Sequence, residues 1–400
     1  MKSPGFWISR HPSADKIILK PDEITQLNKT IENELKLTQD ISSLGSAYSG
    51  EKLKLELKET LESFLKRKLY PDEQIQSNLN LDAIPSQIKP RYGYIVHYAD
   101  QRLFPTTKGL TAKAFDIDFD EIQNSSLDLG TPVVILYESK DGHWLYVISS
   151  ESSGWVETQN VAVCSLKDWI PKNFLVVTKS KADIFLDQDM TQFYDYARMG
   201  ARFRIRSRIN QDVIAVALPL RNTDGIVELA TGYLQIKDIH EGYLPYTARN
   251  MIGQAFELLN APYGWGGMYG EQDCSAFLQE VFSTVGIVLP RNSQSQAKVG
   301  KLLGEFDKNF PSQKKIEILS KQALGGATIL PLKGHIMLFL GTIDDRAYAI
   351  HATWGYREKG FGNDRVRILN RVVVSDLSLG EGSRQGSLLE RLTGVRLIGK

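Results

Sequence analysis

The pattern of apolar and polar positions changes twice along this chain, and the first stretch is helical. Between residues 52 and 68 the apolar side chains recur every three or four positions, with charges elsewhere: Leu53, Leu57, Leu61, Phe64 and Leu65. That spacing predicts an amphipathic helix whose apolar face is buried. The other face is too evenly charged for a helix that lies on a membrane surface. We therefore expect residues 1–88 to form a helical N-terminal segment that packs on its neighbours.

From Arg91 onward the pattern shortens to β-branched and aromatic runs broken by Gly, Asp and Asn, which is typical of small antiparallel barrels. The length fits two of them, at residues 89–168 and 169–241. In the first, an Asp141-Gly142 turn leads into a strand that carries Trp144 and Tyr146. In the second, Arg202, Arg204, Arg206 and Arg208 alternate with other residues, so a regular strand would place all four on one face. A solvated face is the simpler interpretation of that stripe, and a contact for an anionic polymer or an acidic domain is the alternative.

After a linker at residues 242–247 the helical spacing returns, and residues 242–400 are expected to form the largest domain. A glycine-rich loop, residues 263–272, runs into Asp273 and Cys274, and apolar residues then recur at helical spacing up to Val285. Glycines allow such a loop to turn tightly and to approach a substrate. Cys274 is therefore predicted to lie at a helix N-terminus, where the helix dipole favours a thiolate, and we expect a lowered thiol pKa. An inert buried cysteine is the alternative.

Two histidines follow on strand-like apolar runs, His335 in Gly334–Gly341 and His351 in Tyr348–Ala352. A hairpin around Asp344-Asp345-Arg346 would pair these runs as antiparallel strands and bring the two rings together. One imidazole could then accept the thiol proton while the other orients it. A single histidine on an apolar strand is more often a hydrogen-bonded core residue, so the prediction depends on the combination of the three residues.

Composition narrows the class of protein. The chain has 400 residues and a net charge of +1, which predicts several domains and gives no sign of the basic surface of a nucleic-acid binder. No apolar run approaches the roughly 18 residues of a membrane span. The two cysteines, Cys164 and Cys274, cannot form a disulfide framework, and we expect Cys164 to be a buried strand residue. Metal-binding and nucleotide-binding motifs are absent from the sequence, so we expect no metal and no cofactor.

Several motifs in the last domain resemble the NlpC/P60 family of cysteine peptidases, which are bacterial cell-wall hydrolases. The motifs are Tyr-x-Trp-Gly-Gly at Tyr263, Asp-Cys-Ser-x-Phe at Asp273, Leu-Pro-Arg-Asn-Ser-x-x-Gln at Leu289, and Gly-His-Ile-Met-Leu-Phe-Leu-Gly at Gly334. Ala276 replaces the glycine that usually follows Asp-Cys-Ser. The resemblance implies an α+β fold: a papain-like catalytic domain, preceded by two SH3-like β-barrels of the bacterial SH3b type and a helical N-terminal stabilising segment.

The same resemblance implies roles for individual residues. Cys274 would be the nucleophile, His335 the base and His351 the orienting third member. The Tyr263 hydroxyl would donate to the oxyanion together with the Cys274 backbone N–H. Substrate-binding roles would fall to Asp273 and Ser275, which match the positions credited with holding an ammonium group, and to Trp265 in the cleft. Trp144 and Tyr146 could close the pocket from the first barrel, or could simply pack in its core.

SH3-bearing members of the family typically cut the γ-D-glutamyl bond to a diamino acid in peptidoglycan stem peptides, and several require a free L-alanine amine. We therefore expect a monomeric γ-D-glutamyl-L-diamino acid endopeptidase that acts on muropeptides. Two alternatives stay open: a wall-binding SH3 protein with an idle site, and a thiol amidase or acyltransferase. The first residues lack the apolar region of a secretory signal. A cell-envelope location after loss of an export signal or lipoprotein leader is expected, with the cytoplasm as the alternative.

Overall fold

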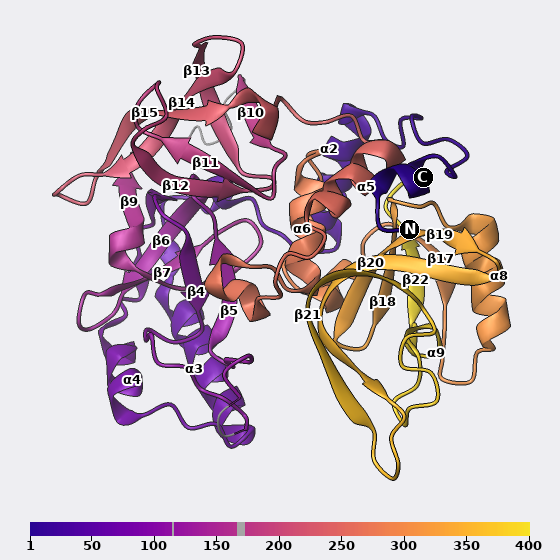
Figure 1. Cartoon of the computed structure of the whole chain (residues 1–400). Helices are drawn as coiled ribbons and strands as arrows, with labels where there is room; N and C mark the ends of the chain where they lie inside the picture. The colour runs from indigo at the N-terminus through magenta and orange to yellow at the C-terminus, as the bar shows by residue number, and fades with distance from the viewer. Residues whose placement is uncertain (114–115, 166–172) are drawn as a thin grey trace.

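The computed structural model describes residues 1–113, 116–165 and 173–400. Figure 1 shows two β-rich parts lying one above the other, and a third part beside them that is made of helices and a long sheet. Strands and helices both contribute, in agreement with the α+β prediction. The helix α6 (Cys274–Ser283), which carries the predicted nucleophile, lies between the β-rich parts and the long sheet.

The first sheet has the strand order β5-β4-β8-β7-β6-β3-β9, and the pairings between these strands are antiparallel. Its bounds are β3 (Arg91–Ile95), β4 (Ala99–Arg102), β5 (Gln123–Leu127), β6 (Pro132–Glu138), β7 (Trp144–Ile148), β8 (Ser153–Glu157) and β9 (Val161–Cys164). Gly142, in the predicted Asp-Gly turn, has φ +72°, a conformation that glycine adopts without steric cost. Cys164 is buried on β9, as predicted.

The second sheet has the order β12-β11-β15-β14-β13-β10-β16. Its bounds are β10 (Phe174–Val177), β11 (Lys181–Phe185), β12 (Phe193–Arg198), β13 (Arg202–Arg208), β14 (Val213–Arg221), β15 (Val227–Gln235) and β16 (Ile239–Glu241). The arginine stripe lies on β13, where the register shifts between Ile205 and Ser207 and interrupts the alternation. Most of its guanidinium groups have partners within the chain: Arg202 donates to the Tyr243 hydroxyl, Arg206 donates to the Leu229 carbonyl oxygen, and Arg208 pairs with Glu241.

The N-terminal 88 residues divide between two places. The first part holds α1 (Pro4–Ile8), α2 (Pro21–Lys29) and a π-helical turn (Thr30–Glu34), and its side chains Trp7 and Ile31 enter the core of the C-terminal part. The second part holds α3 (Gly50–Lys66) and α4 (Glu73–Asn78), and it packs on the first sheet through Leu53, Leu57 and Phe64. Leu65, which we expected on the buried face of α3, is 40% exposed. Amphipathic spacing predicts α3 but not the surface on which it packs.

The C-terminal part places α5 (Ala248–Glu257) and α6 against a sheet with the order β17-β22-β18-β19-β20-β21. Its strands are β17 (Lys301–Glu305), β18 (Thr328–Leu332), β19 (His335–Ile343), β20 (Arg346–Glu358), β21 (Arg365–Asp376) and β22 (Gly394–Leu397), and the same part holds α7 (Ser293–Gln296), α8 (Ser312–Gln322) and α9 (Leu388–Arg391). The last strand, β22, pairs with both β17 and β18, so the end of the chain completes this sheet.

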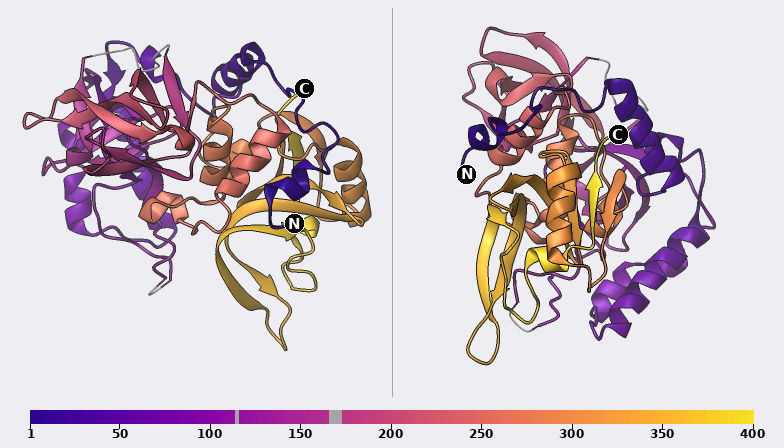
Figure 2. Two further views of the ribbon diagram at one scale, coloured as in Figure 1. Left: turned by 45° about the horizontal axis from the view of Figure 1, so that its top comes forward. Right: turned by 90° about the vertical axis from the view of Figure 1, so that its right-hand side faces the viewer.

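The predicted hairpin between the two histidines is confirmed. Strands β19 and β20 are antiparallel and are joined at Asp344 and Asp345, whose φ angles are +48° and +59°. Two consecutive positive φ angles are typical of a type I′ turn, for which aspartate is well suited. Beyond the sheet, β20 and β21 continue as a hairpin that projects away from the body of the molecule, as Figure 2 shows.

Candidate active site

A cavity of about 530 Å³ contains Cys274 and lies where α3, the first sheet and α6 meet. Its walls come from parts of the chain that are distant in sequence. Sequence-predicted residues that line it are Cys274, Tyr263, Trp265, Asp273, Ser275 and Tyr146. Gly334, the residue before His335, lines it as well. The first sheet and α3 therefore form part of the wall of the cavity that holds the thiol.

Cys274 is the first residue of α6, as predicted from the sequence, and it is 7% exposed. Asp273 is the N-cap, and its carboxylate accepts hydrogen bonds from the backbone N–H groups of Ser275 and Ala276. The expectation of a lowered thiol pKa is wrong for this structure. Burial and the adjacent Asp273 carboxylate raise the pKa of Cys274 to about 12, and they outweigh the favourable backbone N–H groups of Ile336 and Ser275. The resting side chain is a neutral thiol at neutral pH.

The structure brings the two predicted histidines together. Nε2 of His335 lies 2.7 Å from Nδ1 of His351, and Nε2 of His351 lies 3.0 Å from the Ser375 hydroxyl on β21. Burial lowers the pKa of His335 to about 4, helped by Arg391, and it lowers the pKa of His351 well below its usual value. Both rings are therefore neutral at pH 7, and a chain of hydrogen bonds fixes their orientation. The hydrogen bond between His351 and Ser375 was not predicted from the sequence.

Tyr263 lines the cavity that contains the Cys274 thiol, and the pKa of its phenol is raised above the ordinary value. Burial is the largest cause of that raised pKa, followed by Cys274 and Asp273. The phenol therefore keeps its proton and can donate a hydrogen bond to a negatively charged oxygen. A phenol and a backbone N–H at a helix start are both suitable donors for an oxyanion.

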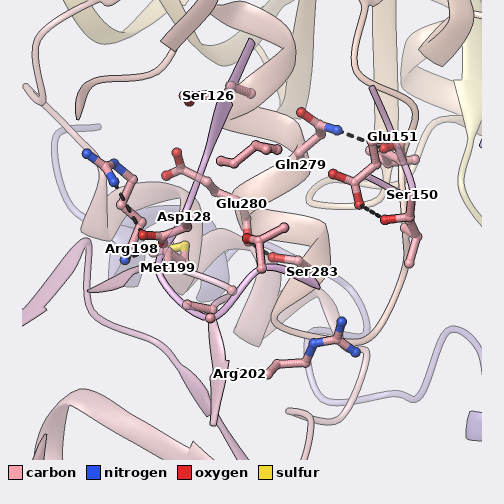
Figure 3. Close-up of a pocket in the computed structure, with 18 of the residues that line it drawn as sticks. Ser126, Asp128, Ser150, Glu151, Arg198, Met199, Arg202, Gln279, Glu280 and Ser283 are labelled. Atoms are coloured by element: carbon pink, nitrogen blue, oxygen red, sulfur yellow. Dashed lines mark hydrogen bonds and ion pairs between the residues drawn. The ribbon is translucent and has the colours of Figure 1, made fainter. Parts of the chain in front are cut away.

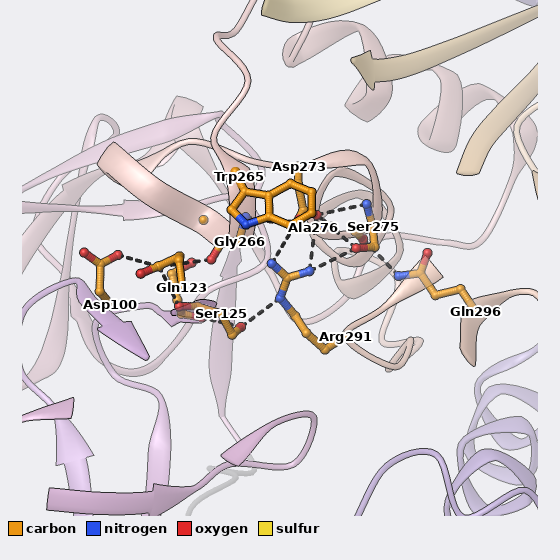
Figure 4. Close-up of polar contacts among 12 residues, drawn as sticks. Asp100, Gln123, Ser125, Trp265, Gly266, Asp273, Ser275, Ala276, Arg291 and Gln296 are labelled. Carbon is orange, nitrogen blue, oxygen red and sulfur yellow. Dashed lines mark hydrogen bonds and ion pairs between the residues drawn. The ribbon is translucent and has the colours of Figure 1, made fainter. Parts of the chain in front are cut away.

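Arg291 is the centre of a buried polar network beside Cys274 (Figure 4). Its guanidinium donates to Oδ2 of Asp273 at 2.7 Å and to the Ser275 hydroxyl at 2.9 Å. It also reaches the hydroxyl of Ser125 in the first sheet at 2.8 Å. Despite burial, Arg291 and the neighbouring donors hold the pKa of Asp273 below its ordinary value. Arg291 stands in one of the motifs found in the sequence, but its role was not predicted.

The glycine-rich loop before Cys274 is held by strand β5 and neighbouring loops of the first β-rich part. The Trp265 indole donates to the Asp120 carbonyl oxygen at 3.1 Å, and the Gln123 amide donates to the Gly266 carbonyl oxygen at 3.2 Å. The Tyr98 hydroxyl donates to the carbonyl oxygen of Gly267. Gly267 has φ +91°, and a Cβ there would lie 2.1 Å from the Ser126 hydroxyl oxygen, so only glycine permits this approach.

The two aromatic residues that we expected from the first barrel have different positions. Tyr146 lines the Cys274 cavity and donates to the Glu56 carboxylate of α3 at 2.8 Å. Trp144 does not line it: the ring is packed in the core of the first part and lines a separate cavity near His143. The two residues lie on β7, two positions apart, but only Tyr146 lines the cavity that contains Cys274. Glu56 was not predicted, since nothing in the sequence links α3 to a cleft formed more than 200 residues later.

A second cavity, of about 230 Å³, also has Arg291 in its lining and lies between the two β-rich parts and α6. Figure 3 shows Glu280 of α6 among Asp128, Arg198 and Glu151. Arg198 pairs with Asp128, and its Nε donates to the Gly270 carbonyl oxygen at 2.9 Å. Burial raises the pKa of Glu280 to about 8. Within residues 1–113, 116–165 and 173–400, no group of three or more His, Cys, Asp or Glu side chains is arranged to hold a metal ion.

Two family models match the chain. Residues 110–157 match the SH3 domain of the SH3b1 type, and residues 260–349 match the NlpC/P60 family. The second match includes Cys274 and His335 and ends just before His351. The chain therefore carries an SH3b-type domain followed by an NlpC/P60 domain, as the sequence motifs predicted.

Similar proteins agree with this assignment. A γ-D-glutamyl-L-lysine dipeptidyl-peptidase from Bacillus subtilis (strain 168) is 41% identical over 56 residues, which are 14% of this chain and about a fifth (19%) of that protein's length. An NlpC/P60 endopeptidase from Photobacterium damselae subsp. piscicida has the same fold, with a TM-score of 0.79 and 21% identity over 100% of this chain and 97% of its own. An NlpC/P60 family protein from Bacillus cereus ATCC 10987 has a TM-score of 0.55 and 17% identity, over 77% of this chain and 100% of its own.

Proposed function

We propose that this protein is a cysteine peptidase that hydrolyses the bond between γ-D-glutamate and a diamino acid in peptidoglycan stem peptides. The observation that carries the proposal is that Cys274, at the start of α6, shares one cavity with Tyr263 and Gly334. Gly334 precedes His335, and the His335 ring is hydrogen-bonded to His351. The NlpC/P60 match and the short similarity to a γ-D-glutamyl-L-lysine peptidase support the class of bond.

The chemistry begins from neutral groups, because the thiol pKa is raised and the imidazole pKa is lowered. As the sulfur attacks the scissile carbonyl carbon, His335 accepts the thiol proton and His351 holds the ring in position. The carbonyl oxygen gains negative charge, which the Tyr263 hydroxyl and the Cys274 N–H stabilise. His335 then donates its proton to the leaving amine, and the acyl-enzyme is hydrolysed by a water molecule that the same ring deprotonates.

The shape and charge of the cavity favour short peptides with a free amino terminus. Because α3 and the first sheet form one wall, a long cross-linked strand has less access than the end of a released peptide. The Glu56 carboxylate stands in that wall, held by the hydroxyls of Tyr146 and Ser153. Asp273 is already bound to Arg291 and to the start of α6, so we assign the ammonium contact to Glu56 first, with Asp273 and Ser275 lining the same cavity.

The SH3b-type domain supports binding of the same substrate class, since its residues Gln123, Ser153 and Tyr146 line the cavity. The domain would then act as a wall of the active site. Among the described residues, no helix combines the length and the apolar character needed to cross a bilayer. We propose that a monomer is sufficient for activity.

The test uses defined tripeptide and tetrapeptide stems, with the alanine amine free or acetylated, and follows the products by mass spectrometry. We expect cleavage between D-glutamate and the diamino acid, and its loss in Cys274→Ala. Binding without turnover by the unmodified protein would indicate a wall-binding protein instead. Cleavage of a different amide, still dependent on Cys274, would indicate an amidase and would overturn the proposed bond.

A further inference from the structure

The hairpin formed by the ends of β20 and β21 projects from the body of the protein and ends in the turn at residues 359–364 (Figures 1 and 2). Its base is braced against the first β-rich part. The Trp354 indole donates to Asp118 at 2.9 Å, and its ring packs on Phe119 with centroids 5.1 Å apart. The projecting turn is therefore held in a fixed direction relative to the active-site cavity.

The projecting end exposes apolar side chains that would ordinarily be buried. Phe361, at the tip, is fully exposed at 104%, and Ile368 and Val366 are 62% and 45% exposed. An exposed group of this kind at the end of a projection commonly marks an interaction site. A phenylalanine ring gains most from contact with an apolar medium, so the partner must offer one.

The same segment is strongly cationic. Residues 357–371 contain five cations, Arg357, Lys359, Arg365, Arg367 and Arg371, and two carboxylates, Glu358 and Asp364. The carboxylates are already engaged, because Glu358 pairs with Arg367 at 2.5 Å and Asp364 accepts a hydrogen bond from the Arg384 backbone N–H. Among the described residues, no ion pair involves Arg357, Lys359 or Arg365, and all three are exposed. The tip therefore offers free positive charge around an aromatic ring.

Three partners could meet these features, and the observations favour one. A second copy of the chain would set like charges against each other where the outer part of β21 has no neighbouring strand. A soluble polyanion would satisfy the cations but would leave Phe361 in water. An anionic lipid bilayer satisfies both, since cations bind its surface and an aromatic ring enters the region just below the headgroups.

We propose that the β20–β21 hairpin docks the protein on an anionic lipid bilayer, with Phe361 inserted and Arg357, Lys359 and Arg365 at the headgroups. Docking of this kind is peripheral and reversible, because one aromatic ring and three free cations give a modest affinity. The enzyme would then work at the surface of a membrane, with its cleft held in a fixed orientation by the Trp354 contact. Docking does not depend on which peptide bond the active site cuts.

The test measures co-sedimentation of the full chain with vesicles of phosphatidylcholine alone, or of phosphatidylcholine with phosphatidylglycerol. We expect binding to the anionic vesicles only, and weaker binding as the salt concentration rises. Phe361→Ser, and separately the double variant Lys359→Glu with Arg365→Glu, should each lower the affinity about tenfold or more. The matched control is Arg204→Glu with Lys237→Glu, an equal change of charge at exposed positions of the second β-rich part, and it should bind normally.

Two results would overturn the proposal. One is no binding to anionic vesicles at low salt. The other is binding that Phe361→Ser leaves unchanged and that soluble dextran sulfate abolishes, which would identify a polyanion site. Every variant should cleave a short soluble stem peptide as well as the unmodified protein does. That control separates loss of docking from failure to fold, and it keeps this proposal distinct from the proposed peptidase activity.

Discussion

The guanidinium of Arg291 lies 2.7 Å from Oδ2 of Asp273, and both side chains are about nine-tenths buried. This ion pair lies beside Cys274 and extends, through the Arg291 contact with Ser125, into the first sheet. Asp273 also caps α6, so the pair fixes the first turn of the helix that carries the thiol. Local helix capping, domain contact and the active site therefore depend on the same two residues.

Loss of Arg291 should leave a buried carboxylate without its partner. We expect Arg291→Met to lower the free energy of unfolding by about 3–5 kcal/mol and to reduce peptidase activity strongly. The double variant Arg291→Met with Asp273→Asn should recover part of the stability, because no uncompensated charge remains buried. Urea denaturation checks both values. A single variant as stable as the unmodified protein would show that the pair contributes little to the fold.

The raised pKa of Cys274 predicts a thiol that reacts slowly at neutral pH. Alkylation by iodoacetamide needs the thiolate, so the rate at Cys274 should keep rising with pH well above 9, toward a thiol pKa of about 12. Mass spectrometry of digested protein distinguishes Cys274 from Cys164. Asp273→Asn should increase the rate at a given pH, because it removes a neighbouring negative charge. A rate that is already maximal at pH 7 would contradict the neutral resting state.

Much of the fold could be predicted because its signals are local. The alternating apolar runs around His335 and His351 and the Asp344-Asp345 turn predict the hairpin, and the structure confirms it. The spacing after Cys274 likewise predicts α6. The packing of the first 88 residues on two different cores could not be predicted, because amphipathic spacing identifies a buried face without identifying its partner.

Site residues that lie within one sequence motif could be predicted. Contacts between residues that the fold brings together from distant positions could not. Glu56 and Tyr146 meet across 90 positions of sequence. The pKa of the Cys274 thiol is raised by burial and by the neighbouring Asp273 carboxylate, so the helix dipole considered alone predicts a shift in the wrong direction. Trp144 and Tyr146 lie two positions apart on β7, and local spacing gives no sign that only Tyr146 lines the cavity.

The close approach at Gly267 predicts that a methyl group there would disturb the active site. Alanine would need φ near +91° and would clash with Ser126, so Gly267→Ala should move the loop away from the first sheet and lower kcat/KM by about tenfold or more. Gly253, in the middle of α5, has open space within 4 Å of the point where an added methyl group would lie, and Gly253→Ala should keep full activity with slightly higher stability. Equal activity of the two variants would show that the loop contact is dispensable.

The position of the Glu56 carboxylate in the cavity wall predicts a preference for substrates with a free amine. Glu56→Gln keeps the shape of the side chain and removes its charge, so the KM for a stem with a free alanine amine should rise about tenfold or more, with kcat little changed. The KM for the acetylated stem should stay the same, because that substrate brings no ammonium group. Steady-state kinetics on the two substrates give the comparison. If Asp273→Asn removed the preference while Glu56→Gln kept it, the ammonium contact would belong to Asp273.

The free energy of unfolding should depend on pH through Glu280 and His335. A single substitution at Glu280 tests its contribution separately. The pKa of Glu280 is about 8 in the folded protein, whereas its ordinary value is 4.5. Between pH 4.5 and pH 8, the folded state therefore holds a proton that the unfolded state has released. Stability from this group is therefore present below pH 4.5 and is lost as the pH rises through 8. The groups that face it are Arg198 and Lys181, which favour its charge, and Asp128 and Glu271, which oppose it.

Glu280→Gln removes this titration, so the variant should be more stable than the unmodified protein at pH 8, on the order of 2–4 kcal/mol, and nearly equal at pH 5. His335 acts in the opposite direction. Its pKa of about 4 lies below the ordinary 6.5, so it destabilises the fold as the pH falls from 6.5 toward 4, in both proteins alike. Thermal denaturation across pH 4–9 separates the two contributions, with the exposed Glu305→Gln as the matched control. A gain at pH 8 that Glu305→Gln reproduces would arise from net charge and would contradict a protonated Glu280.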